Sequence, residues 1–326
     1  MINFEIDLKL RCLLHLSTLY CLNRYNNALT LKYSGMKKLL FYLFMTLFLA
    51  ACEKNKESTS DALNVAGIRS GDSKEVINLR LKSGEITSNT IPCYIFGSSV
   101  FDPNTIGFGY VDCYSRFNMI DPQTGVVIYS YQLPGMLNQV VIDTGDNAVI
   151  GHYFENDSNY LVKVNLENGA LVSKKAIDFG GGLYATTYFF NPIKKEYVLL
   201  RADGFLLSIK PETAAIVKST SVESNIQEAC YDTPENRLIG LTYSEATNQN
   251  YIEILDVETG DLLSRVEIKV KHAYRGGISG FDPETNCYIL VTAENEILFI
   301  DIETGEIKDS YQIDFDITEF KFWRSI

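Results

Sequence analysis

The 326-residue chain lacks most of the residues and motifs that mark catalytic and metal-binding proteins. It has three histidines and no Cys-x-x-Cys pair, so its cysteines match no zinc-site spacing. No Gly-x-Ser-x-Gly or His-Glu-x-x-His sequence occurs, so two common catalytic signatures are missing. The apolar run of residues 39–49 is too short for a helix that spans ~30 Å of hydrocarbon. These absences favour a binding protein over an enzyme, and no cofactor is expected.

Basic residues are also scarce. The chain has 29 lysines and arginines against 41 aspartates and glutamates, a net charge of −12. Six of the basic and two of the acidic residues precede Cys52, which leaves 23 basic and 39 acidic residues from Cys52 onward, a net −16. Such a chain repels phosphate backbones and anionic lipid, so nucleic acid is not an expected partner. Attachment to a membrane requires something other than charge.

Residues 36–52, MKKLLFYLFMTLFLAAC, have the parts of a secretory signal. A methionine and two lysines precede a short apolar run and then small residues. The ending Leu49-Ala50-Ala51-Cys52 resembles the lipobox of bacterial lipoproteins. That resemblance implies cleavage before Cys52, a thioether-linked lipid on its sulfur, and stable anchoring by two or more acyl chains, palmitate among the candidates. An ordinary signal peptide with an accidental cysteine is the alternative.

This signal sets the expected division of the chain. A signal peptide acts at an N-terminus, so we interpret residues 1–35 as upstream sequence translated from a misplaced start; a long, atypical signal is the alternative. Residues 36–51 are then the signal peptide. Residues 52–62 form a lipidated, polar and flexible tether, and residues 63–326 form the folded domain.

The folded part repeats itself about every 45 residues. One motif is a strand that runs into a turn, as in EILDVETG (253–260) and LFIDIETG (298–305). Its Asp position recurs in steps of 41, 44, 45, 46 and 45 residues, at Arg80, Asp121, Asn165, Lys210, Asp256 and Asp301. A second turn motif, as in FDPET (281–285), precedes each full copy. Its Asp or Asn recurs at Asp102, Asp143, Asn191, Asp232 and Asp282.

The repeated Asp residues have two interpretations, a metal or catalytic site and a turn. Because Asn165, Lys210 and Arg80 fill the same position, we favour the turn: an Asp side chain accepts from the next backbone N–H groups, and the Gly takes a positive φ. Each unit then holds four short antiparallel strands, which is typical of a β-propeller blade. The sequence predicts an all-β fold and a single propeller.

Five complete blades can be counted, over about 94–133, 138–178, 184–222, 226–270 and 274–313. Three further strands near 63–91 and one at 316–323, with Phe320 in the place of Phe281, complete a sixth. Strands from the two ends would thus close the ring and remove its exposed edges. Six blades are predicted, with seven as the alternative.

The strand–Asp-x-x-Thr-Gly–strand pattern over residues 63–326 resembles bacterial propellers of the YVTN and quinoprotein-like type. This resemblance implies a fold group rather than an activity. The WD-repeat signature is missing, and the single tryptophan, Trp323, leaves no docking motif of quinoprotein dehydrogenases, so no quinone cofactor is expected. The short, tyrosine-rich lipoprotein resembles those of Bacteroidota. A location on the outer membrane, on its periplasmic or surface side, follows from that resemblance.

Four cysteines remain after Cys52, and their state is open. Cys93, Cys113, Cys230 and Cys287 could form disulfides in an oxidising compartment or remain free, buried thiols on strands.

Candidate binding residues come from the repeat frame. Propellers usually work at one mouth of the central channel, which is lined by inter-blade loops and by the ends of the innermost strands. Aromatic and hydrogen-bonding side chains at these positions suit a binding face for a protein or a glycan: Gln139, Tyr184, Tyr188, Glu228, His272, Tyr274, Arg275 and Glu319. The main hypothesis is a membrane-anchored, non-catalytic binding or scaffold propeller. The alternative is a glycan hydrolase whose paired carboxylates, Glu228 and Glu319, line the channel.

Overall fold

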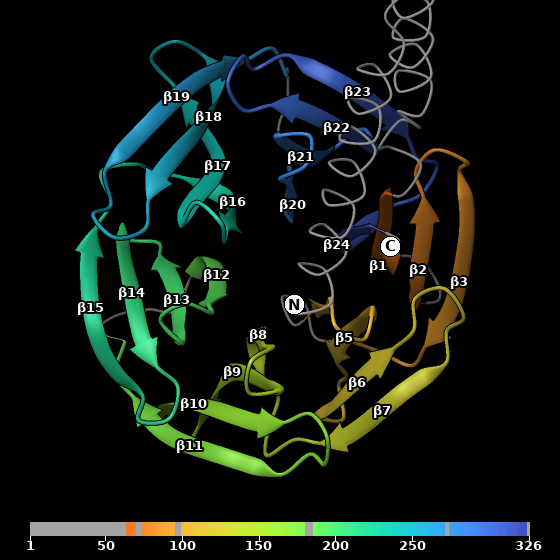
Figure 1. Cartoon of the computed structure of the whole chain (residues 1–326), viewed down its shortest axis with the longest axis vertical. Coiled ribbons are helices and arrows are strands. Elements are labelled where there is room, and N and C mark those ends of the chain that lie inside the picture. Colours follow the sequence, from red (N-terminus) through yellow and green to blue (C-terminus); the bar gives the residue numbers. More distant parts are fainter. Residues whose placement is uncertain (1–62, 70–73, 95–98, 180–184, 271–273, 325–326) are drawn as a thin grey trace, which may run out of the picture. The chain divides into compact units, whose positions relative to one another are not determined.

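Twenty-four strands make up the part of the chain that the computed structural model describes, residues 63–69, 74–94, 99–179, 185–270 and 274–324. These residues belong to one compact unit, Ser60–Ile326. Their strands form six antiparallel sheets of four, which stand as blades around a central axis (Figure 1). The predicted six-bladed propeller is confirmed. The predicted signal peptide, Cys52 and the tether lie outside the described residues.

Each blade runs from an inner strand at the axis to an outer strand at the rim (Figure 1). Blade 1 holds β24 and β1–β3, and blades 2 to 6 hold β4–β7, β8–β11, β12–β15, β16–β19 and β20–β23. The inner strands are β24 (Ile317–Arg324), β4 (Ser99–Asp102), β8 (Asn138–Asp143), β12 (Ala185–Asn191), β16 (Gln227–Asp232) and β20 (Tyr274–Asp282). The second strands are β1 (Leu63–Arg69), β5 (Gly107–Val111), β9 (Ala148–Glu155), β13 (Glu196–Arg201), β17 (Arg237–Ser244) and β21 (Cys287–Thr292).

The outer half of each blade has the same plan. The third strands are β2 (Lys74–Arg80), β6 (Arg116–Ile120), β10 (Ser158–Asn165), β14 (Phe205–Lys210), β18 (Gln249–Asp256) and β22 (Glu296–Asp301). The outer strands are β3 (Glu85–Ile91), β7 (Val127–Gln132), β11 (Leu171–Ile177), β15 (Ala215–Ser221), β19 (Leu262–Ile268) and β23 (Ile307–Gln312). Strand β21 is buried along its whole length, because neighbouring blades cover both of its faces.

The repeated Asp residues form turns, as predicted. The Asp301 carboxylate accepts hydrogen bonds from the backbone N–H groups of Glu303 (3.0 Å) and Thr304 (2.8 Å), and Gly305 has φ +72°. A Cβ on Gly305 would lie 2.1 Å from the carbonyl oxygen of Glu267 in the preceding blade, so this turn also needs glycine to pack against its neighbour.

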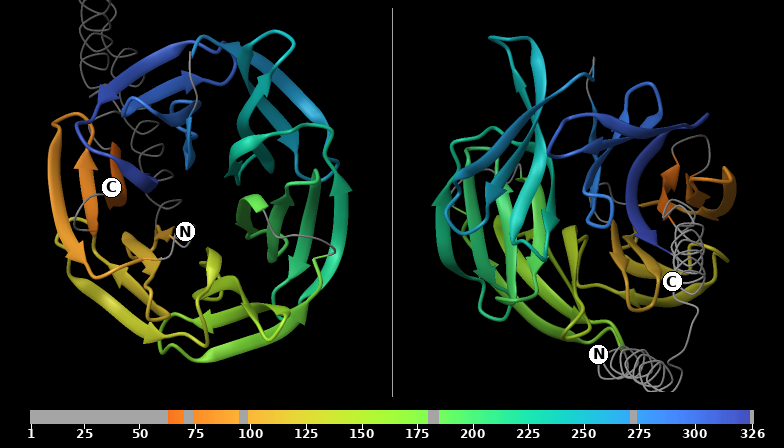
Figure 2. Two further views of the ribbon diagram at one scale, coloured as in Figure 1. Left: turned by 180° about the vertical axis from the view of Figure 1, so that it is seen from behind. Right: turned by 45° about the horizontal axis from the view of Figure 1, so that its top comes forward.

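The ring closes between the two ends of the described chain. Strand β24 pairs antiparallel with β1, and Figure 2 shows the C-terminal strand (blue) beside the N-terminal strands (orange). A Cβ on Gly67 would lie 2.5 Å from the carbonyl oxygen of Glu319, so glycine permits the close approach of β24. The predicted closure by strands from the two ends is confirmed.

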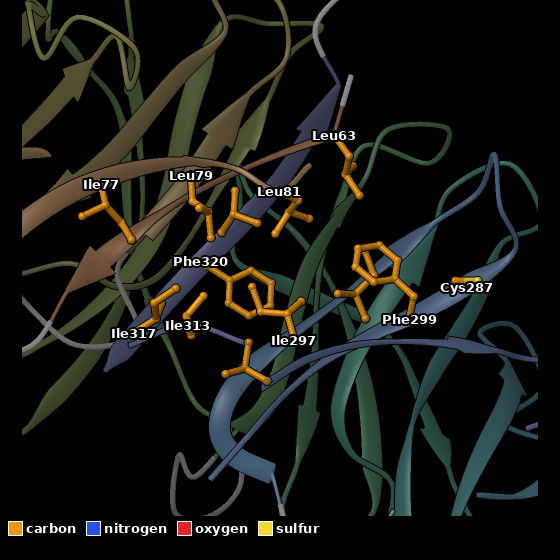
Figure 3. Packing of buried hydrophobic residues seen from close by; sticks show 13 residues of the cluster. Leu63, Ile77, Leu79, Leu81, Cys287, Ile297, Phe299, Ile313, Ile317 and Phe320 are labelled. Carbon is orange, nitrogen blue, oxygen red and sulfur yellow. The ribbon is translucent and has the colours of Figure 1, made fainter. Parts of the chain in front are cut away.

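The core consists of side chains clasped between neighbouring blades. Figure 3 shows the cluster between blades 1 and 6, where Leu79 and Phe320 meet Ile297 and Phe299. Equivalent clusters occupy the other junctions. Burial of aliphatic and aromatic surface at these junctions stabilises the ring at about 25 cal/mol per Å².

The cysteine question is resolved for the four residues after Cys52. Cys93, which follows β3, forms a disulfide with Cys113 in the turn between β5 and β6. Cys230 and Cys287 are free thiols on β16 and β21. Both alternatives left open by the sequence therefore occur in the same chain.

Candidate functional site in the central channel

A cavity of about 840 Å³ lies on the axis of the ring, and the inner strands of all six blades line it. Its walls come from equivalent positions of the repeat. The residue just before the turn at the end of each inner strand forms one layer: Phe101, Ile142, Phe190, Tyr231, Phe281 and Phe322. The residue after the turn position contributes Pro103, Thr144, Pro192, Thr233 and Pro283. The cavity therefore extends to the end of the channel where the inner strands turn.

Strand pairing shows which residues of β24 are equivalent to those of the other inner strands. In blade 6, Cys287 on the second strand pairs with Asp282 on the inner strand and with Asp301 on the third strand. In blade 1, Asn64 has the same role, because it pairs with Trp323 on the inner strand and with Arg80 on the third strand. Trp323 thus holds the place of the turn Asp, and Phe322 holds the place of Phe281. The prediction that Phe320 takes that place was wrong by two residues, because no Asp-Pro pair marks the end of β24.

Aromatic rings give the cavity rigid walls. Phe101 of blade 2 stacks on Trp323 of blade 1, with ring centroids 6.0 Å apart and planes at 17°. Phe189 and Tyr231 stack across blades 4 and 5 at 4.1 Å. Because these contacts cross blade boundaries, the ring geometry holds the aromatic surfaces in place.

Among the described residues that line the cavity, Lys321 is the only charged one. Protein surrounds its side chain, which still keeps part of its surface accessible. Burial lowers the pKa of the Lys321 ammonium from its ordinary value, against the opposing effect of the Glu319 carboxylate. Its charge also acts on Cys230 of blade 5, whose pKa is raised mainly by burial. The Lys321 charge therefore lowers, to a small extent, the pKa of a thiol two blades away.

Glu319 and Tyr188 lie on opposite blades of the ring. Glu319 is only 5% exposed. Burial raises the pKa of Tyr188, and the charge of Glu319 raises it further. The same charge acts on Tyr94, whose hydroxyl lies 2.8 Å from that of Thr318. The Glu319 carboxylate thus raises the pKa of two phenols, one on the opposite blade and one after β3.

The candidate face predicted from the sequence is only partly gathered at the cavity. Tyr188 lines it, whereas Gln139, Glu228 and Glu319 do not. Tyr274 and Arg275 begin β20, but their side chains, and all of Tyr184 and His272, lie outside the described residues.

Gln139 and Glu228 have a structural part in common. Both adopt positive φ, +52° and +49°, where β8 and β16 shift register. The carbonyl of Gln139 accepts a hydrogen bond from the Tyr197 hydroxyl (3.0 Å), and that of Glu228 accepts one from Tyr288 (2.6 Å). Each bond joins one blade to the next.

The sequence interpretation missed Lys321 and the aromatic layer as binding residues. The signal for the layer was present, since an aromatic residue precedes the Asp-Pro or equivalent turn in most copies. Lys321 had no such signal, because the matching positions hold Val100, Val141, Phe189, Cys230 and Gly280.

Two further observations apply to the described residues alone. No group of three histidine, cysteine or acidic side chains among them is placed to hold a metal ion. Nor does any helix within that part of the chain have the length and apolar character needed to cross a membrane.

Comparison with known proteins shows the fold. No family model matches the chain, and no curated protein matches it. Among solved structures, TolB from Acinetobacter baumannii is similar with a TM-score of 0.57 and 13% identity, over 79% of this chain and 65% of the TolB chain. This chain thus spans slightly less than two thirds of that neighbour.

Two other solved structures are similar at comparable levels. The WD40 β-propeller domain of Doa1 has a TM-score of 0.51 and 13% identity, over 79% of this chain and 81% of that one. A chain of the nidogen–laminin complex has a TM-score of 0.55 and 9% identity, over 80% and 98%. At these identities the likeness establishes a β-propeller.

Proposed function

We propose that the chain is a lipid-anchored, non-catalytic binding propeller of a bacterial cell envelope, which recognises a protein or a glycan at one end of its ring. The anchor is the lipid on Cys52 expected from the lipobox, on the outer membrane. The disulfide between Cys93 and Cys113 supports this placement, because disulfides persist in oxidising compartments.

One observation carries the binding role: the aromatic cavity on the axis. Its volume falls within the roughly 300–1,000 Å³ of ligand pockets, and it combines apolar walls with a few polar groups. All six blades contribute to it, so it exists only in the closed ring. It also favours the turn end of the channel over the strand-start end where the sequence placed the candidate face.

A protein partner has additional support from the neighbours, since the nidogen structure is that of a complex with laminin. Aromatic surfaces also suit sugar rings, so a glycan is the second possible partner. The hydrolase alternative has no such support, because the described lining of the cavity includes no aspartate or glutamate.

The test is affinity purification of the tagged, full-length protein from cross-linked cells of its own species. Phe281→Ala removes an aromatic group from the turn end, and Tyr274→Ala with Arg275→Ala alters the strand-start end. Phe154→Ala is the matched control, since Phe154 is 64% exposed on β9. We expect a stoichiometric partner that is lost in Phe281→Ala and retained in the Tyr274/Arg275 variant and in Phe154→Ala.

Three other outcomes would change the proposal. Loss of the partner only in the Tyr274/Arg275 variant would move the binding face to the strand-start end. No enriched protein, together with retention of the ring on an immobilised envelope glycan, would assign a glycan partner. A Cys52→Ala variant that stays in the membrane fraction would contradict the lipid anchor.

A further inference from the structure

The starting observation is a lysine with no partner in an acidic protein. Among the residues that the structure describes, none forms a hydrogen bond or ion pair with the Lys321 side chain, although its backbone pairs with Ala66 in the sheet. Other lysines of this chain find carboxylates: Lys174 contacts Glu155 at 2.7 Å, and Lys308 lies 3.6 Å from Asp301. A partly enclosed ammonium without a counter-ion is costly, so its retention on a cavity wall needs a reason.

The surroundings of Lys321 define what could serve as its counter-ion. The cavity is large enough for an organic molecule, and most of its wall is aromatic or aliphatic. The other polar side chains among the described lining residues carry hydroxyl or thiol groups: Ser99, Thr144, Tyr188, Cys230, Tyr231, Thr233 and Ser279. Such a wall suits an apolar, flat molecular body, while the ammonium suits one acidic group.

The number of charges on the ligand follows from the same inventory. A second negative charge would find no cation on the described wall. It would also meet the field of Glu319, which stands two residues away on the same strand and already raises the pKa of Tyr188 beyond the effect of burial. A single negative charge is therefore the best match.

We propose that the cavity binds a small amphipathic organic acid, with its single anionic group on the Lys321 ammonium and its apolar body against the aromatic layer of Phe101, Tyr231, Phe281 and Phe322. This inference rests on the proposed binding role of the cavity. In this enclosed site the ion pair forms charge-assisted hydrogen bonds that water does not strongly weaken.

The experiment compares two fluorescent probes of similar shape. 8-Anilinonaphthalene-1-sulfonate is an aromatic monoanion, and N-phenyl-1-naphthylamine is its uncharged analogue. Each is titrated into the folded chain from Cys52 onward, in wild-type, Lys321→Met, Lys321→Arg and Lys175→Met forms. Lys175 is exposed on the outer strand β11, so its variant controls for the same loss of charge and for probe bound at the rim.

We expect one anionic probe per ring, and an affinity at least about tenfold weaker in Lys321→Met, since a charged hydrogen bond is lost. The uncharged probe should bind Lys321→Met within about twofold of wild type, which also shows that the variant is folded. Lys321→Arg should keep most of the affinity for the anion, and Lys175→Met all of it.

Equal affinity of the anionic probe for wild type and Lys321→Met would overturn the inference, as would binding of neither probe to the wild type. These outcomes are distinct from failure of the proposed function. A partner recovered in the purification by a ring that binds no probe would refute only the organic acid. Probe binding that depends on Lys321, with no partner recovered, would refute only the macromolecular partner.

Discussion

Two lysines in different regions of the propeller show opposite treatments of a positive charge. Lys163, at the junction of blades 3 and 4, is 3% exposed and contacts three carboxylates, Asp143 (3.0 Å), Asp146 (2.7 Å) and Glu212 (3.0 Å). Lys321, on the channel wall, has no such contact within the described residues. The buried ammonium of Lys163 is neutralised by carboxylates at a blade junction, whereas the ammonium of Lys321 faces a cavity in which a ligand can bind it.

The repeat sharpens this contrast. The position of Lys163 is apolar or uncharged in the other blades, as with Met119, Ile254 and Phe299. A charge is tolerated there because carboxylates reach it from the turns of two blades. The three carboxylates exceed what one ammonium needs, and Lys195 supplies a further cation to Asp146 at 2.8 Å.

We expect the largest effect from removal of the neutralised charge of Lys163. Lys163→Met should lower the free energy of unfolding by about 3–5 kcal/mol, because it strands the buried Asp143 carboxylate. Denaturant unfolding measures the change. Lys195→Met is the matched control: its side chain is 59% exposed, so solvent screens its ion pair and we expect a much smaller loss than for Lys163→Met. Similar losses in the two variants would contradict the structural role of Lys163.

A second test concerns His152, a buried base that avoids the cost of a buried positive charge by staying neutral. It is 7% exposed, and its Nδ1 has no hydrogen-bond partner among the described residues. Burial lowers the pKa of His152 to about 4. Since the unfolded chain takes up this proton near pH 6.5, stability should fall as the pH drops from about 6.5 to 4, by up to about 3 kcal/mol.

His152→Phe should remove that pH dependence, because phenylalanine carries no proton. Unfolding curves of both proteins between pH 7 and pH 4 measure it. Parallel loss of stability in wild type and variant would show that His152 is not the titrating group.

A third test lowers the charge of the Lys163 cluster by acid. Hydrogen bonds from Lys163 and Lys195 hold the pKa of Asp146 at about 2, below its ordinary value near 3.8. A depressed carboxyl pKa contributes stability that is present above the unfolded value and lost as the pH falls toward the folded one. The stability gap between wild type and Lys163→Met should therefore shrink between about pH 4 and pH 2. A constant gap would mean that Asp146 gains nothing from Lys163.

We expect the smallest effect on stability from removal of the Lys321 charge. Lys321→Met should change the free energy of unfolding by no more than about 1 kcal/mol, because no described partner is left unpaired and the cost of enclosing the ammonium disappears. Denaturant unfolding of Lys321→Met and Lys163→Met under the same conditions compares the two losses directly. A loss as large as that of Lys163→Met would mean that Lys321 is a structural residue.

The regular part of the fold was predictable from the sequence. Asp-x-x-Thr-Gly turns and alternating strands repeat locally, and local turn chemistry depends on few neighbours. The six blades and the closure by residues 63–91 and 316–323 followed from that spacing. Asp121 illustrates it, since its carboxylate accepts from Gln123 N–H at 2.8 Å and from the Thr124 hydroxyl at 2.8 Å, as a turn residue should.

The candidate site was less predictable, because it depends on irregular strands. Register shifts at Gln139 and Glu228 disturb the alternation from which side-chain direction is inferred. In β24 the substitution of Trp323 for the turn Asp removes the landmark that aligns it with other inner strands. Lys321 therefore could not be assigned to the channel until the pairing of β24 with β1 was known.

Strand β24 has one more consequence. It supplies Phe320, Lys321, Phe322 and Trp323 to the cavity, and it is also the strand that fastens the ring by pairing with residues about 250 positions earlier in the chain. Any molecule bound at Lys321 binds the fastened ring and not the opened one, so it must shift the opening equilibrium by RT ln(1 + [L]/Kd). Ligand binding in the channel and the stability of the pairing between β24 and β1 would then be thermodynamically linked. Slower hydrogen exchange in β24 and β1 would report the ligand from outside its own site.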